Sequence, residues 1–221
     1  MPITSVQLAE NFAGARRDST SGRAYPLGEA DRPKRVASTT AELEAIIRYL
    51  DVERSARYQP TPTNTFCNIY ACDYCYLTGA YLPRVWWTDA ALQSLRADQK
   101  VEPKYGVTVG ELNANSLYVW LRDFGPSFGW RPRASVDELQ DAANQGQVAV
   151  ICARNKLLSA SGHIAAVVPE SAPAPVAERT GNYVQLPLQS QAGRRNFCFS
   201  CGHGRWWEGA QFQAFGFWTH A

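Results

Sequence analysis

The chain has 221 residues, of which 45% are hydrophobic, so it is long enough to bury one substantial core and fits one domain or at most two small ones. Its 22 basic and 20 acidic side chains leave a formal charge of +2, which argues against nucleic acid as the main partner because such proteins need a concentrated basic footprint. No apolar run reaches the roughly 18 residues that a membrane-spanning helix requires, so we expect no membrane insertion.

The first 38 residues differ in composition from the rest of the chain. They are rich in Arg, Ser, Gly, Asp and Pro and show no sustained period. This predicts an N-terminal arm over 1–38, extended on the domain or partly mobile, followed by a single domain over 39–221. From Ser38 onward, capping residues precede apolar side chains at helical spacing, which predicts a first amphipathic helix.

A second helix is predicted after two prolines that end the first pattern. Asn64 and Thr65 are good N-cap residues, so we expect this helix to begin at or near Phe66 and to end at Gly79. Two further segments have the pattern of short helices closed by glycine, residues 112–125 and 135–146.

Beyond Gly146 the pattern changes to short runs of β-branched, aromatic and alternating residues separated by Gly, Pro and Asn. These runs predict strands over residues 146–153, 162–168, 182–191 and 211–220. Helices followed by a meander of strands predict an α+β fold in which the helix after Asn64 packs on an antiparallel sheet.

Three of the six cysteines, Cys67, Cys72 and Cys75, lie in the second predicted helix. A thiol attacks as the thiolate, and the free backbone N–H groups and dipole of a helix N-terminus lower a thiol pKa. Cys67 lies in the first turn, whereas the other two lie deeper, where neither effect helps. Position therefore favours Cys67 as a nucleophile.

A cysteine nucleophile needs a base, and the chain offers three histidines, His163, His203 and His220. His163 follows a glycine and opens a predicted strand, which places its ring at the end of the sheet where a helix N-terminus can meet it. His220 is the penultimate residue and His203 lies between glycines, so both are harder to hold rigidly. We expect His163 to be the general base.

At these residues the chain resembles the NlpC and CHAP groups of papain-like peptidoglycan amidases and endopeptidases. The resemblance rests on TNTFCNIY, which contains Cys67, and on SGHIAAVVPE, which contains His163, and it extends over roughly residues 58–219. It implies a papain-like fold and hydrolysis of an amide by acyl transfer. The chain departs from the common Asp-Cys-Ser-Gly signature, having Phe66 before the cysteine and Asn68 after it.

The resemblance also implies a third residue that orients the base, in the predicted strand over 182–191. Gln185, Gln189 and Gln191 share one face there by alternation; we favour Gln191, with Gln189 as the alternative. The oxyanion would be stabilised by the backbone N–H of Cys67, and Tyr58 is the counterpart of an upstream tyrosine in many family members. No cofactor or metal is implied for this chemistry.

Each of these residues also has a structural interpretation. Cys67 would then be a buried thiol that packs as a small apolar residue, and His163 a strand-end histidine with satisfied hydrogen bonds. Asp73 is expected to be a structural carboxylate, and Cys152 a core residue within an apolar strand.

Two C-x-x-C units are the main alternative source of function. Together with His203 they have zinc-ligand chemistry, which would make the chain a zinc-stabilised binding module with an inert Cys67. A disulfide among the four thiols is another alternative, favoured if the protein works in an oxidising periplasm. The four cysteines are Cys72, Cys75, Cys198 and Cys201.

Two aromatic pairs and one basic pair are further candidates for ligand contacts. Trp86–Trp87 and Trp206–Trp207 have the chemistry to line a groove, although buried aromatic pairs are the commoner use of such sequences. Arg194 and Arg195 have the chemistry to meet substrate carboxylates, with a solvated surface pair as the competing interpretation.

The resulting expectation is a cell-wall hydrolase that cleaves an amide of the peptidoglycan stem peptide. The N-terminus lacks the pattern of a secretory signal, which favours an antibacterial toxin made in the cytoplasm and delivered to the periplasm of target cells by a type VI-like secretion apparatus. Such an effector would need a cognate immunity protein. A phage-type endolysin of the same chemistry is the alternative, and a protease or transglutaminase acting on proteins is a third.

Overall fold

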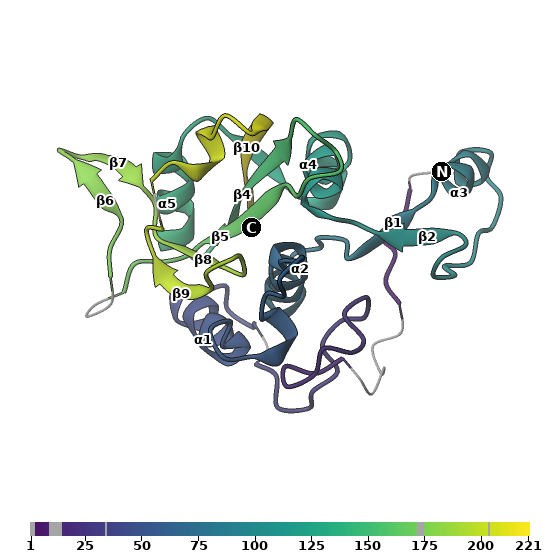
Figure 1. Cartoon of the computed structure of the whole chain (residues 1–221), viewed down its shortest axis with the longest axis horizontal. Helices are drawn as coiled ribbons and strands as arrows, with labels where there is room; N and C mark the ends of the chain where they lie inside the picture. Colours follow the sequence, from purple (N-terminus) through teal and green to yellow (C-terminus); the bar gives the residue numbers. More distant parts are fainter. Residues whose placement is uncertain (1–2, 9–14, 34, 172–174, 203) are drawn as a thin grey trace.

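The computed structural model describes residues 3–8, 15–33, 35–171, 175–202 and 204–221, which form an α+β fold, as the sequence predicts (Figure 1). The main sheet has six strands in the order β3-β10-β4-β5-β8-β9, and every neighbouring pair is antiparallel. These strands are Arg131–Arg133 (β3), Val148–Asn155 (β4), His163–Val167 (β5), Gln189–Gln191 (β8), Phe197–Ser200 (β9) and Phe212–His220 (β10).

Helices cover both faces of this sheet, and each face has its own apolar core. On one face lie α1 (Thr40–Leu50), α2 (Cys67–Thr78) and α4 (Ala114–Asp123), which bury the even-numbered side chains of β4 and β5. On the other face α5 (Val136–Asn144) and the 3₁₀ turn η3 (Trp206–Glu208) bury odd-numbered side chains of the same strands. Because side chains alternate along a strand, a central strand that is covered on both faces is apolar throughout.

Smaller elements lie around this framework. The hairpin of β1 (Val85–Trp87) and β2 (Val109–Glu111) encloses α3 (Asp89–Arg96), and a second hairpin joins β6 (Glu178–Thr180) to β7 (Tyr183–Leu186). Figure 1 shows the two hairpins at opposite ends of the molecule. Two further 3₁₀ turns are η1 (Ala56–Tyr58) and η2 (Gly125–Phe128). Within the described residues no helix is long and apolar enough to span a bilayer.

The four predicted helices are confirmed, with local reasons for their ends. A capping box of Thr39 and Glu42 opens α1, Asn113 caps α4 and Ser135 caps α5. At the end of α2, Gly79 takes the left-handed conformation (φ 79°) that closes a helix and that glycine adopts without strain. The helix α3, which is short and follows the N-cap Thr88, was not predicted.

The strand predicted over 182–191 is wrong as a single element. The structure divides it into β7, which pairs with β6 in a separate hairpin, and β8, which joins the main sheet. Pro187 lies between them and has no N–H to donate to a ladder, so the chain changes sheet there. Gln185 therefore belongs to the hairpin and does not share a sheet face with Gln189 or Gln191.

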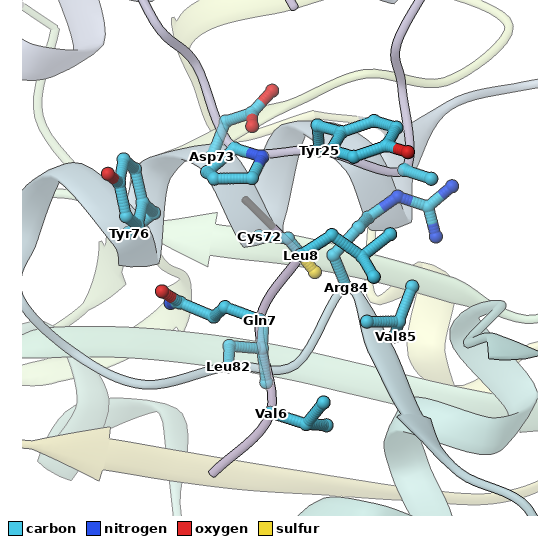
Figure 2. A pocket seen from close by; sticks show the side chains of 12 residues that line it. Val6, Gln7, Leu8, Tyr25, Cys72, Asp73, Tyr76, Leu82, Arg84 and Val85 are labelled. Carbon is cyan, nitrogen blue, oxygen red and sulfur yellow. The ribbon is translucent and has the colours of Figure 1, made fainter. Parts of the chain in front are cut away.

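The N-terminal arm packs on the domain along its described residues. Val6, Leu8 and Leu27 are buried in the same core as α1 and α2, and the Tyr81 hydroxyl exchanges hydrogen bonds with the backbone N–H and C=O of Val6. Figure 2 shows Val6, Gln7 and Leu8 running toward α2, with Leu8 beside Cys72. The cavity that remains between them holds only about 20 Å³ and is walled by Cys72, not Cys67, so it is not a candidate active site.

Candidate active site

The N-terminus of α2 has no side-chain cap, contrary to the sequence prediction. The N-cap residue is Phe66, which makes no capping hydrogen bond. Asn64 instead uses its side chain on the Thr63 hydroxyl, and its backbone N–H donates to the Thr61 hydroxyl. No side-chain oxygen therefore competes for the N–H groups of the first turn, which leaves them to an anion at Cys67.

The imidazole of His163 lies between the Cys67 thiol and the side chain of Gln191. Its Nε2 is 2.6 Å from Gln191 Oε1, while the Gln191 amide nitrogen donates to the Arg195 carbonyl. The bond to Arg195 fixes the orientation of the Gln191 amide. Gln191 Oε1 therefore accepts a hydrogen bond from His163, and His163 Nε2 carries the proton. The other ring nitrogen, Nδ1, is left for the thiol, with which His163 forms a side-chain hydrogen bond.

Electrostatics at this pair lower the pKa of the thiol and raise the pKa of the imidazole. Burial by itself would raise the pKa of the Cys67 thiol, but the hydrogen bond and charge of His163, with the N–H groups of Ile164 and Asn68, outweigh it and lower the pKa. Burial by itself would lower the pKa of His163, but Cys67 and then Gln191 outweigh it and raise the pKa. Opposite shifts of two hydrogen-bonded groups are typical of an activated thiol.

Contacts between α2 and the sheet bring these three residues together. The Tyr70 hydroxyl, one turn after Cys67, forms a hydrogen bond with the Ser190 hydroxyl of β8. Asn196 follows the end of β8 and donates to the carbonyls of Val52 and Tyr58, which precede α2. Helix and strand are thereby fixed in register at the end that carries Cys67 and Gln191.

A second set of contacts positions the loop before His163. Asn115 on α4 donates to the Ala160 carbonyl and accepts from the Asn155 N–H, so it ties both ends of the β4–β5 loop to the helix. At Gly162 a Cβ atom would lie 2.5 Å from Asn115 Oδ1 and 2.6 Å from the Ala153 carbonyl oxygen. Only glycine fits this close approach, which explains the glycine before the histidine.

Trp206 packs edge to face on the His163 ring, with ring centroids 4.6 Å apart. Its indole N–H donates to Gln189 Oε1 at 2.8 Å. The alternative third residue, Gln189, is fully buried, and within the described residues its side-chain hydrogen-bond partners are Trp206 and the carbonyls of Pro187 and Cys201, whereas Gln191 bonds His163 directly. A register shift between Gln189 and Gln191 ends the simple alternation that the sequence analysis assumed.

A cleft with two adjoining parts lies beside Cys67 and His163. The basic lobe, of about 420 Å³, is lined by His163, Gln191, Arg194, Arg195 and Trp206, among others. The thiol hollow, of about 100 Å³, is lined by Cys67, Asn68 and the β4–β5 loop. Thr65 and Ser161 belong to the walls of both parts. The thiol and imidazole therefore meet where the two parts join.

The oxyanion role expected of Tyr58 is wrong, because its hydroxyl lies in the interior. Tyr58 is fully buried and donates to Asp73 Oδ2 at 3.0 Å, and the same carboxylate receives two hydrogen bonds from Arg57, at 2.6 and 3.2 Å. Asp73 is thus the structural carboxylate that the sequence predicts. The pair stabilises the packing of η1 against α2.

The remaining cysteines lie in other environments. Burial raises the pKa of Cys72 to about 12 and raises the pKa values of Cys75 and Cys152 well above the usual range. Cys198 and Cys201 are half-buried on and after β9, and all six cysteines are free thiols. In the part of the chain that the structure describes, no group of three or more His, Cys, Asp or Glu side chains is arranged to hold a metal ion.

Of the other two histidines, the structure describes His220, which lies away from the cleft. His220 contacts the Trp130 ring and the Phe128 carbonyl at the far end of β10. His203 lies outside the described residues.

Sequence reasoning missed the residues that position the site. Ser190, Asn115 and Asn196 act through hydrogen bonds between distant segments, and no motif marks them. Trp206 was noted only as a groove candidate. No motif marks Arg23 of the arm either, although its guanidinium lies 3.5 Å from the ring centroid of Phe66, the residue before Cys67.

Comparison with known proteins adds no relative, because no protein-family model, curated protein or solved structure matches this chain.

Proposed function

We propose that this protein is a papain-like cysteine hydrolase that cleaves an amide bond in bacterial peptidoglycan. The observation that carries the proposal is the Cys67–His163–Gln191 arrangement: a thiol with a lowered pKa in the first turn of an uncapped helix, hydrogen-bonded to an imidazole that a glutamine amide orients. An inert buried thiol has no need of such partners, because burial alone keeps it protonated.

Acyl transfer follows from this geometry. His163 Nδ1 takes the thiol proton, and the Cys67 sulfur attacks the amide carbonyl carbon while the backbone N–H of Cys67 stabilises the oxyanion. The C–N bond then breaks, and the imidazolium returns its proton to the leaving amine. Water attacks the thioester with His163 as base, which releases the carboxylic acid and restores the thiol.

The charge of the cleft supports an acidic peptide as substrate. Arg194 and Arg195 line the basic lobe, whose described lining residues include no Asp or Glu. Stem peptides of peptidoglycan carry free carboxylates, which guanidinium groups recognise. The substrate class itself comes from the resemblance to the NlpC and CHAP groups.

For the biological role we propose an interbacterial effector that acts in the periplasm of a target cell. The cell that makes such an enzyme is unharmed while the enzyme stays in its cytoplasm, away from the cell wall. An immunity protein that covers the cleft then protects related cells that receive the enzyme. A phage-type endolysin would use the same chemistry without an immunity partner.

Isolated sacculi test the proposal. We expect wild-type protein to release muropeptide fragments with new amine and carboxylate ends, identified by mass spectrometry, and Cys67→Ala protein of the same fold to release none. Circular dichroism and thermal unfolding of both proteins provide the folding control. If wild-type protein leaves sacculi intact but hydrolyses casein, the substrate assignment fails and the cysteine mechanism stands; fragment release by Cys67→Ala would refute the mechanism.

A further inference from the structure

The position of Tyr58 in the core leaves the oxyanion of the proposed reaction with one donor, the backbone N–H of Cys67. Oxyanion sites of acyl-transfer enzymes commonly use two donors, which come from backbone N–H groups or side chains. A second donor has to lie in the wall of the thiol hollow, within hydrogen-bond reach of the same oxygen atom.

The walls of the thiol hollow offer five side chains with a hydrogen-bond donor besides Cys67. Three of them do not belong to the walls of the basic lobe, which contain His163. Of these three, Asn68 donates to the Leu112 carbonyl at 2.8 Å, and Asn113 is held at the start of α4, where its side-chain oxygen accepts from the Ser116 N–H. Among the described residues, the two remaining donors are hydroxyls that lie where the two parts of the cleft meet. The five residues are Thr65, Asn68, Asn113, Ser159 and Ser161.

The hydroxyls of Thr65 and Ser161 differ in which reacting group they accompany. Thr65 is half-buried and lies two residues before Cys67, whereas Ser161 is exposed and lies two residues before His163. Within the described residues neither hydroxyl makes a hydrogen bond. In the tetrahedral intermediate the imidazolium has to reach the leaving nitrogen, so the oxyanion points away from the imidazole, toward the N-terminus of α2. Thr65 is the residue at that end.

The segment that carries Thr65 is held in place on both sides of the cleft wall. Thr61 and Asn64 close a turn, in which the Thr61 N–H donates to the Asn64 carbonyl at 2.9 Å and the Asn64 N–H donates to the Thr61 hydroxyl at 3.0 Å. Arg194, which follows β8, donates to the carbonyls of Thr61 and Pro62 at 2.7 and 3.1 Å. A donor on a fixed segment stabilises a developing charge without reorganisation during the reaction.

We propose that the Thr65 hydroxyl is the second oxyanion donor, beside the backbone N–H of Cys67. This rests on the proposed function and adds a catalytic residue to it. As the Cys67 sulfur adds to the carbonyl carbon, the π electrons of the C=O bond move to the oxygen, and the Thr65 O–H donates to that oxyanion. When the C–N bond breaks, the electrons return to form the carbonyl again, and the hydroxyl keeps its proton throughout.

Two reagents that react with Cys67 separate an oxyanion role from a structural one. p-Nitrophenyl acetate acylates the thiolate through a tetrahedral oxyanion that expels p-nitrophenolate, whereas iodoacetamide alkylates it by displacement of iodide, without an oxyanion. We expect Thr65→Val to slow acylation about 10²-fold and to leave the alkylation rate within about twofold of wild type. Thr65→Ser, which keeps a hydroxyl, should restore acylation to within about threefold of wild type.

Thr180→Val is the matched control, because it makes the same exchange on β6, outside both parts of the cleft. Absorbance of p-nitrophenolate gives the acylation rate, and Cys67→Ala protein gives the background from the other thiols. Wild-type acylation in Thr65→Val would overturn the proposal. Equal losses of acylation and alkylation would also overturn it, because Thr65 would then act on the thiol or the fold. A loss confined to Ser161→Ala would assign the donor to Ser161 instead.

The ester makes this test independent of peptidoglycan. If wild-type protein leaves sacculi intact while Thr65→Val loses acylation alone, the peptidoglycan assignment fails and the oxyanion role stands. If wild-type protein cleaves sacculi and Thr65→Val does so at the same rate, the role of Thr65 is refuted and the hydrolase proposal stands. Absence of acylation at wild-type Cys67 would refute both. On muropeptides we expect Thr65→Val to lower kcat with KM within about twofold, because the oxyanion forms only after substrate binding.

Discussion

Cys67 and Cys72 lie on the same helix, and each is only 4% exposed, yet their pKa values move in opposite directions. Burial raises the pKa of both thiols. At Cys72 nothing outweighs that effect and the pKa reaches about 12, whereas at Cys67 the hydrogen bond to His163 and two backbone N–H groups reverse it. The comparison shows that neither burial nor helix membership decides thiol reactivity; the imidazole and the free first-turn amides do.

The largest expected difference in kcat is between the serine variants of Cys67 and Cys72. We expect Cys67→Ser to lower kcat on muropeptides by at least about 10⁴-fold, because a buried hydroxyl is not ionised by a neighbouring imidazole. Cys72→Ser should retain kcat within about threefold, since that thiol lies away from the cleft. Steady-state kinetics on both purified variants measure this difference. Equal losses of kcat in the two variants would show that the two thiols do not differ in function.

Removing the imidazole should make Cys67 behave like Cys72. Because the lowered pKa leaves the thiolate populated at lower pH, His163→Ala should move the pH profile of iodoacetamide alkylation at Cys67 to higher pH and slow alkylation at pH 7. We also expect a loss of about 10²- to 10⁴-fold in kcat.

Mass spectrometry of the Cys67 peptide gives the alkylation rate, and His220→Ala is the matched control because His220 packs on Trp130, away from the cleft. An unchanged alkylation profile in His163→Ala would show that the imidazole does not activate the thiol.

Gln191 and Gln189 act on the base at different distances. We expect Gln191→Ala to lower kcat/KM by about tenfold to a hundredfold, equivalent to the roughly 1.5–3 kcal/mol of a hydrogen bond to a charged group. Gln189→Met should cost about threefold in kcat/KM, because the bonds it loses, to the Trp206 indole and to the carbonyls of Pro187 and Cys201, do not involve His163. The acidic limb of the pH–rate profile should shift in Gln191→Ala, which a purely structural role would not cause, and a larger loss in Gln189→Met would reverse the assignment.

The smallest effect is expected at Tyr58. Tyr58→Phe removes one of the donors to the buried Asp73, so the free energy of unfolding should fall by about 1–2 kcal/mol in urea titrations. Activity per folded molecule should stay within about twofold, because the hydroxyl does not face the cleft. A large loss of kcat in a stable Tyr58→Phe protein would restore the oxyanion role that the sequence suggested.

Much of the framework follows from local patterns in the sequence. The apolar spacing of Leu43 to Leu50, the caps at Thr39 and Ser135, and the glycine after α2 each act within a few residues, so the helices are predictable. The same holds for Cys67 in a first helical turn and for His163 at the start of a strand. Strand pairing is less local, which is why the division at Pro187 and the short strands β1, β2, β3, β6 and β9 were not predicted.

By itself, the sequence determined the α+β class, the helix that begins at Cys67, and the thiol and imidazole of the candidate site. Only the tertiary structure decided which glutamine reaches His163, that Tyr58 points into the core, and that the thiol hollow and the basic lobe share the wall residues Thr65 and Ser161. The physical reason is the distance along the chain between the residues that interact. Caps and periodicity act over one or two turns, whereas the contacts of Tyr70 with Ser190, and of Asn196 with Val52, join segments that meet only after the sheet has formed.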